Sequence, residues 1–308
     1  MYETDQLWAT TSNQQLIQKM DKEKIFYDLI DNPRNIYENA TLFKQKRRDP
    51  SSYNDILKEG LSYTEEDQIL NCLSHPTDPH ISKEKEWKSQ NSKFLNYHKS
   101  LTPHTFFNSI AIDHYIGNKT GLNDIKDAVV FDVGGGTGHF LTSFFKFPRS
   151  LEYYLIDPNV RLLHDQFIRM YPQLLDLEMG HILALGEDLP FKNEVADLVV
   201  SSSSIDHMKD HKLFIKESYR CLKSGGKFLV SSHISGAKTK SKKSISLSGM
   251  FESIARMIHR LQNRVALNDH VLEFSSTKAL ETAMMDVGFL IQESEVFKNY
   301  FYVVAIKS

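Results

Sequence analysis

An acidic residue precedes a run of glycines in the stretch VVFDVGGGTGHF, which covers residues 129–140. Asp132 ends an apolar run that is typical of a buried strand, and four glycines follow it: Gly134, Gly135, Gly136 and Gly138. Glycines permit a tight turn and a close backbone approach because they have no Cβ. A strand, a glycine loop and a helix in this order bring backbone N–H groups and a helix N-terminus toward a ligand. The stretch therefore predicts a cofactor site.

A second acid, Asp157, ends the next apolar run and is followed by a proline. It stands ~20 residues beyond the glycine loop, which is the spacing that a ribose ligand needs. A dinucleotide fingerprint would require a third glycine, but the two possible registers put His139 or Leu141 there. An acid before the glycines would repel a pyrophosphate and can bind an ammonium group. The pattern favours a nucleoside cofactor that carries a positive charge.

A histidine lies in the stretch VVSSSSIDHM, residues 199–208. Imidazole titrates near neutral pH, so His207 could act as a general base for a hydroxyl acceptor; it could equally pack the loop. His233 and His270 lie on loops at the same edge, where they could join His207 and Asp206 in a metal site. Their spacing is not that of a compact ligand set, so we expect no metal.

Strands and helices alternate from residue 127 onward, which predicts a mostly parallel sheet with helices on both faces. Seven strands are predicted, at 128–133, 153–156, 181–185, 196–201, 227–232, 289–296 and 300–306. Helices are predicted at 137–147, after 158, and at 211–223 and 276–287. The predicted fold class is α/β, a doubly wound Rossmann-like sheet whose last two strands form an antiparallel pair.

Residues 1–120 differ from this core, because they hold almost no glycine and no clear strand run. Thr64 and Asp67 are typical of a helix start ahead of the apolar residues that follow. We predict that residues 1–120 form a helical extension, which packs on the core and could also cap the substrate. Residues 121–308 would form the cofactor-binding core.

An insertion at 233–272 separates the fifth strand from the last helix. It begins with a basic loop, GAKTKSKK, and continues with apolar residues at helical spacing. Arg256, Arg260 and Arg264 repeat on another face. They could be the solvated face of a lid or dimer helix, or they could contact an anionic acceptor or a membrane surface.

Composition limits the class of protein. The 308 residues are 41% hydrophobic. Their formal charge is −2, so no basic field indicates a nucleic-acid partner. The two cysteines, Cys72 and Cys221, are too few for a disulfide framework. No apolar run approaches ~18 residues, and the first residues lack the apolar region of a signal peptide. We expect a cytoplasmic protein with no transmembrane segment, for which peripheral membrane contact and the oligomeric state stay open.

These motifs, in this order, resemble the class I S-adenosylmethionine-dependent methyltransferases, and specifically their small-molecule type 11 group. The resemblance covers about residues 125–308 and includes the segment GEDLPF at 186–191 and the turn RCLKSGG at 220–226. It implies S-adenosylmethionine as the cofactor and S-adenosylhomocysteine as the product. The cofactor-binding residues that it implies are Asp132, Gly134, Gly135, Gly136, Asp157, Gly186, Glu187 and Ser202.

The resemblance also implies methyl transfer to a small molecule, with His207 as the candidate catalytic residue. An oxygen of a sugar or another biosynthetic intermediate is the first expected acceptor. A carbon of a quinone-like or lipid-like molecule is the alternative, and an inactive cofactor-binding subunit is a third reading. The motif that marks methyltransferases of nucleic-acid amino groups is missing, because Ser201–Ser204 occupies its place.

Overall fold

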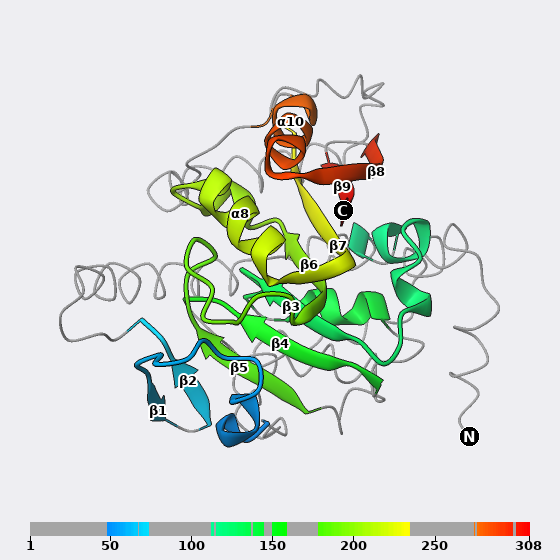
Figure 1. The fold of residues 1–308 in the computed structure, drawn as a ribbon. Helices are drawn as coiled ribbons and strands as arrows, with labels where there is room; N and C mark the ends of the chain where they lie inside the picture. Colours follow the sequence, from blue (N-terminus) through cyan, green and yellow to red (C-terminus); the bar gives the residue numbers. More distant parts are fainter. Residues whose placement is uncertain are drawn as a thin grey trace, which may run out of the picture.

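The structure is a computed structural model that describes residues 48–66, 68–73, 112–113, 115–136, 138–144, 150–158, 178–234, 274, 276–297 and 300–308. Its centre is a single sheet (Figure 1) with the strand order β1-β2-β5-β4-β3-β6-β7-β9-β8. The strands are β1 (Thr64–Glu66), β2 (Ile69–Asn71), β3 (Val129–Val133), β4 (Glu152–Ile156), β5 (Met179–Leu183), β6 (Ala196–Ser202), β7 (Leu222–His233), β8 (Phe289–Phe297) and β9 (Tyr300–Lys307).

The sheet is parallel from β2 through β7. The chain runs from β3 outward through β4 to β5, and then returns to the other side of β3 as β6. This reversal between β3 and β6 is the place where doubly wound sheets bind ligands, outside the carboxyl ends of the strands. Strand β9 lies between β7 and β8 and is antiparallel to both. The predicted α/β sheet with an antiparallel last pair is confirmed.

The N-terminal region adds two strands that were not predicted. Strands β1 and β2 pair in antiparallel fashion, and Gln68 between them adopts a φ of 61°, so the predicted helix start at Thr64 is wrong. Strand β2 pairs in parallel with β5, and Leu70 is fully buried. The edge of β5 offers unpaired backbone groups, and satisfying them outweighs the local helix signal. The described sheet therefore has nine strands where seven were predicted.

Two α-helices have described bounds, α8 (His211–Cys221) and α10 (Lys278–Val287). The Asp210 side chain accepts a hydrogen bond from the Leu213 N–H and caps α8, and Gly288 ends α10 with a φ of 115°. The short 3-10 helices are η1 (Pro50–Tyr53), η2 (Leu122–Asp124), η3 (His139–Phe144) and η6 (Ile205–His207). Residues 112–113 and 115–119 are also helical. The predicted helix at 137–147 is thus a 3-10 helix over its described part.

Side chains alternate between two cores along the strands. Phe131 and Val133 face the core that holds residues of α8 and α10. Val130 faces the opposite core, which holds residues of the helical stretches 112–113 and 115–119 and of η3. Helices therefore cover both faces, as the doubly wound fold requires. The predicted helix after residue 158 and most of the insertion at 233–272 lie outside the described residues.

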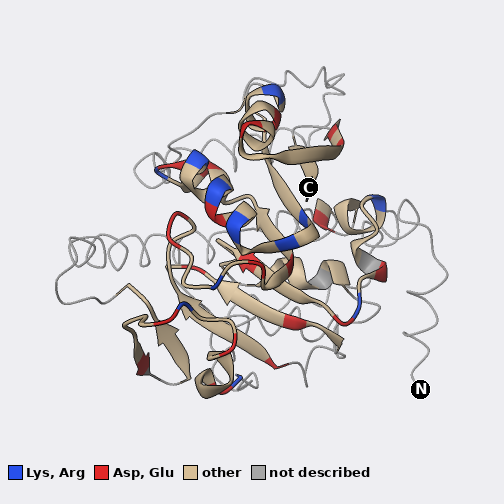
Figure 2. Ribbon diagram, viewed as in Figure 1, with Lys and Arg blue, Asp and Glu red and all other residues tan. Residues whose placement is uncertain are grey.

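Charges of both signs are distributed over the described elements. Figure 2 shows Lys and Arg residues along α8, with Asp and Glu residues on the loops beside it. No helix in the described ranges has the length and the apolar character that crossing a membrane demands.

Candidate active site

The glycine loop lies where the sequence predicted it, at the carboxyl end of β3. Val133 is paired with Ile156 of β4, and the Gly134 N–H donates to the Ile156 carbonyl at 2.7 Å. Asp157 follows β4 directly, and its Oδ2 accepts a hydrogen bond from the Gly136 N–H at 3.0 Å. The structure thus brings together the loop and the acid that stand apart in the sequence. The carboxylate is largely buried, with 9% of Asp157 exposed.

The glycines are required by the protein itself. Gly134 has a φ of +73°, and a Cβ on it would lie 2.4 Å from the Ser204 Cβ. A Cβ on Gly135 would lie 2.3 Å from the Leu155 Cδ1. Such distances are shorter than any packed contact, so a side chain would force the loop away from β4 and from η6. The loop can approach its neighbours, and hence a ligand, only as glycine.

Asp132 lies beneath the loop and is fully buried. Its Oδ2 accepts a hydrogen bond from the Tyr153 hydroxyl at 2.6 Å, and its Oδ1 has no hydrogen-bond partner within the part of the chain that the structure describes. Burial raises the pKa of Asp132 to about 7; the hydrogen bond from Tyr153 opposes this rise and the charge of Asp157 adds to it. Asp132 thus lies in the core under the glycine turn. Its contact with a cofactor ammonium group stays a prediction.

Gly186 lies between the end of β3 and α8. A Cβ on it would meet side-chain atoms of Phe214, Met208 and Val133 at 3.0–3.1 Å. The Glu187 carboxylate accepts from the Lys209 N–H at 2.9 Å and from the Asp210 N–H at 3.4 Å. The side chain predicted to bind a cofactor is therefore bonded to the backbone that leads into α8. The predicted contacts of Gly186 and Glu187 with a cofactor stay predictions.

Ser202 belongs to a buried polar network on the face of the sheet opposite to the one that α8 covers. Its hydroxyl donates to the Asp113 Oδ1 at 3.2 Å and accepts from the Ser231 hydroxyl at 3.0 Å. The Asp113 Oδ2 lies 3.3 Å from the His139 Nε2. Burial raises the pKa of Asp113. The hydrogen bond from Ser202 lowers this pKa, and the charge of Asp132 raises it further. Burial also lowers the pKa of His139 to about 4.

Asp113 was not predicted to belong to the site, and His139 was given no role in it. The available signal was an acid among Ile110, Ile112 and Ile116 in a segment with helical spacing. An acid on an apolar helix face requires a buried partner, and the network supplies it. This network joins Asp113 of the helical stretch 112–113 to His139, the first residue of η3.

His207 ends η6 and is partly exposed. The Ser204 hydroxyl donates to the Val133 carbonyl at 3.0 Å, which ties the start of η6 to the end of β3. The His207 N–H donates to the Ser204 carbonyl at 3.0 Å. His207 therefore stands at the same sheet edge as the glycine loop, as predicted. Its role as a base stays a prediction.

Metal ligands do not gather around His207 within the described ranges. No group of three or more His, Cys, Asp or Glu side chains there could hold a metal ion. The His233 ring lies 3.9 Å from the Tyr300 ring, between centroids, and His270 is outside the described residues.

Comparison with known proteins relates residues 131–230 to methyltransferases. Residues 131–230 match the family described as a methyltransferase domain. The chloroplastic 2-methyl-6-phytyl-1,4-hydroquinone methyltransferase of Arabidopsis thaliana is 29% identical over 151 residues, which cover 45% of this chain and 44% of that protein. The ubiquinone/menaquinone biosynthesis C-methyltransferase UbiE of Haemophilus ducreyi is 30% identical over 106 residues, which cover 34% of this chain and 41% of that protein. The chain spans less than half the length of these two relatives.

Among solved structures, the 1,6-didemethyltoxoflavin-N1-methyltransferase of Burkholderia thailandensis, crystallised with S-adenosylhomocysteine, aligns over 82% of this chain and 97% of its own. The TM-score is 0.48 and the identity 14%. The family match begins within β3 at residue 131 and ends within β7 at residue 230, and it includes the glycine loop, Asp157 and η6. The chain therefore contains a region, residues 131–230, that matches the methyltransferase domain family.

Proposed function

We propose that this protein transfers the methyl group of S-adenosylmethionine to a small-molecule acceptor. One observation carries the proposal. The Asp157 carboxylate and the Gly134–Gly136 turn meet at the carboxyl ends of neighbouring parallel strands, and the Gly136 N–H bonds the carboxylate at 3.0 Å. This is the position at which sheets of this kind bind nucleoside cofactors.

The residues present fit the cofactor that the family uses. A carboxylate offers about four lone-pair sites, so Asp157 can accept from ribose hydroxyls while it also accepts from Gly136. The backbone of the loop, which has no Cβ at Gly134 to Gly136, would lie against the methionyl part, and Gly186 against adenine. The bound cofactor supplies an electrophilic methyl group on a positively charged sulfur.

The acceptor that we favour is the ring carbon of a quinol-like molecule. Support comes from the two relatives described above, one named as a hydroquinone methyltransferase and the other as a C-methyltransferase of quinone biosynthesis. Loss of a phenolic proton would make the ring carbon a better nucleophile. His207, placed at the same edge as the loop, is the candidate base for that proton.

An oxygen of a sugar or another biosynthetic intermediate is the second candidate. The position of His207 favours it as well, because a hydroxyl acceptor also benefits from a base near neutral pH. Nucleic acid is not expected as the acceptor, since the formal charge of the chain is −2. We place the reaction in the cytoplasm, and the free thiols of Cys72 and Cys221 are compatible with a reducing compartment.

Turnover with an acceptor panel tests the proposal. The full chain is incubated with S-adenosylmethionine and with alkylated hydroquinones or hydroxylated sugars, and the product is examined by mass spectrometry and NMR. We expect a new methyl group on a ring carbon of a hydroquinone. A methyl group on a sugar oxygen would select the second candidate. Formation of no methylated product with any acceptor, despite cofactor binding, would favour an inactive cofactor-binding subunit.

A further inference from the structure

A short segment before the methyltransferase domain pairs with the chain that follows Gly186. We call residues 54–58 the N-terminal strap. The Lys58 N–H donates to the Pro190 carbonyl at 2.9 Å, and the Lys192 N–H donates to the Ile56 carbonyl at 2.8 Å. Leu57 forms an antiparallel bridge with Phe191, and both side chains are buried. The strap thus runs alongside residues 190–192 although it lies outside the family match at 131–230.

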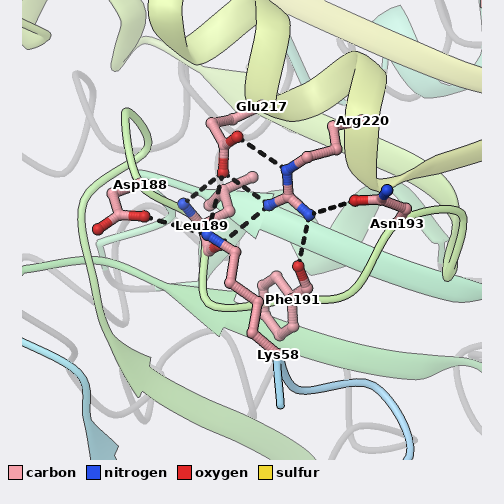
Figure 3. Close-up of polar contacts among 7 residues, drawn as sticks. All are labelled: Lys58, Asp188, Leu189, Phe191, Asn193, Glu217 and Arg220. Carbon is pink, nitrogen blue, oxygen red and sulfur yellow. Dashed lines mark hydrogen bonds and ion pairs between the residues drawn. The ribbon is translucent and has the colours of Figure 1, made fainter. Parts of the chain in front are cut away.

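The Lys58 side chain extends this pairing toward the cofactor segment. Its Nζ lies 3.1 Å from the Asp188 Oδ1 and 3.7 Å from the Glu217 Oε2. Figure 3 shows the ammonium group reaching between the loop and α8. Within the described residues, Lys58 is therefore the strap side chain that forms ion pairs with both Asp188 and Glu217. Asp188 follows Glu187, and Glu217 belongs to α8.

Glu217 and Arg220 hold the other side of the same segment. The Glu217 Oε2 accepts from the Leu189 N–H at 3.1 Å. Arg220 donates to the Leu189 carbonyl at 3.1 Å and to the Phe191 carbonyl at 2.6 Å (Figure 3), and it pairs with Glu217 at 2.6 Å. Both backbone groups of Leu189 are thus fixed by one ion pair. The segment 188–191 is held between the strap and α8.

The electrostatics of Glu217 reflect both partners. Burial alone would raise the pKa of the Glu217 carboxyl. The hydrogen bond and charge of Arg220, together with the charge of Lys58, hold that pKa below its ordinary value. Lys58 therefore stabilises the ionised form of the group that fixes Leu189, three residues beyond Gly186.

We propose that the N-terminal strap, through Lys58, positions the segment 186–189 for cofactor binding. The proposal rests on the proposed function, since that segment is the one expected to lie against adenine. Lys58 is a positioning residue: it acts through Asp188 and Glu217. The strap makes the region before the domain part of the cofactor site, in addition to any role in capping the substrate.

Binding and kinetics of full-length variants test the inference. In Lys58→Met we expect S-adenosylhomocysteine to bind ~2- to 5-fold more weakly by calorimetry, since one partly exposed ion pair is lost. The KM for S-adenosylmethionine should rise by a similar factor while kcat is retained. Hydrogen exchange at the amides of residues 186–192 should become faster, and Lys58→Arg should restore affinity.

A matched control comes from an ion pair at the opposite ends of the strands. The Lys223 Nζ lies 2.9 Å from both carboxylate oxygens of Asp197, which also accepts from the Val129 N–H. Lys223→Met should leave the cofactor affinity unchanged. Arg220→Lys keeps the charge but loses the double contact with Leu189 and Phe191, and it should weaken binding more than Lys58→Met does. If Arg220→Lys does not fold, Lys58→Met alone decides.

The outcomes separate the inference from the function. If the parent chain binds the cofactor tightly, and Lys58→Met shows the same affinity and the same hydrogen exchange, the inference is overturned. The proposed function is then unaffected. Equal weakening in Lys58→Met and Lys223→Met also overturns it, because the effect would then be general destabilisation. No binding by the parent chain contradicts the proposed function, and the inference with it.

Discussion

The Asp157 carboxylate bonds the backbone N–H of Gly136 at 3.0 Å, so the acid that is expected to bind ribose also fixes the glycine loop. One side chain thereby connects the two halves of the cofactor site.

This double role predicts a graded response to substitution. Asp157→Ala loses the contact with the loop and the contact with ribose, and we expect ~10- to 100-fold weaker binding of S-adenosylhomocysteine, as for the loss of charged hydrogen bonds. Asp157→Asn keeps an acceptor for the Gly136 N–H, so it should bind more tightly than Asp157→Ala. Calorimetry on both variants checks this order, and equal affinities in the two variants would contradict it.

The close packing of Gly135 predicts a loss of stability. In Gly135→Ala, the new methyl group would lie 2.3 Å from the Leu155 Cδ1 and 2.5 Å from the Asp132 Oδ2. We expect a decrease of ~1–3 kcal/mol in the free energy of unfolding, as in overpacked cores. Gly225→Ala is the control, because Gly225 has a φ of +76° but open space around its Cβ position. Urea denaturation should show a smaller loss there, of about 1 kcal/mol, and the reverse order would count against the described loop.

Burial of Asp132 predicts a pH dependence of stability. Its pKa is raised to about 7 from the ordinary 3.8, so the folded state binds this proton more tightly than the unfolded state does. The resulting stabilisation is complete below pH ~4 and is lost as the pH rises through ~7, at up to about 1.4 kcal/mol per pH unit. Asp113 and Asp157 lie near and titrate too, so the test compares the parent chain with Asp132→Asn.

Unfolding by urea between pH 4 and pH 8 provides that comparison. The free energy of unfolding of the parent chain should fall with rising pH more steeply than that of Asp132→Asn, which can still accept from the Tyr153 hydroxyl. Parallel curves for the two proteins would show that Asp132 does not titrate in this range.

His207 allows a separation of chemistry from binding. We expect His207→Gln to bind S-adenosylhomocysteine as the parent chain does but to lose kcat by ~100-fold or more, as for the removal of a general base. Turnover with the preferred acceptor, measured at saturating cofactor, checks this. Full turnover in a variant that binds cofactor normally would remove the base assignment and leave His207 as a packing residue of η6.

Much of the core could be predicted because its signals are local. The apolar runs around Asp132 and Asp157 and the glycines between them define β3, the loop and β4, with bounds that differ by a residue at most for these two strands. Helix ends such as Gly288 after α10 also have local signatures.

The remaining features depend on partners that are distant in the sequence. Strands β1 and β2 form because β2 pairs with the edge of β5. The local sequence TEEDQILN contains no signal that predicts this pairing. The carboxylate of Glu187 is bound by the backbone before α8, and that of Asp113 meets Ser202 on β6. The hydrogen-bond partners of a polar side chain are set by tertiary packing. A sequence motif can therefore predict that such a residue lies at the site, but it does not predict which groups the side chain bonds to.

Calorimetric titration of the full chain tests whether this protein binds S-adenosylmethionine. S-adenosylmethionine, S-adenosylhomocysteine and NAD are each titrated into the protein under the same conditions. We expect one-to-one binding of the first two ligands and no measurable binding of NAD, because the third glycine of the dinucleotide fingerprint is replaced by His139 or Leu141 in the two possible registers. Absence of binding for both S-adenosyl compounds, or preferential binding of NAD, would contradict this expectation.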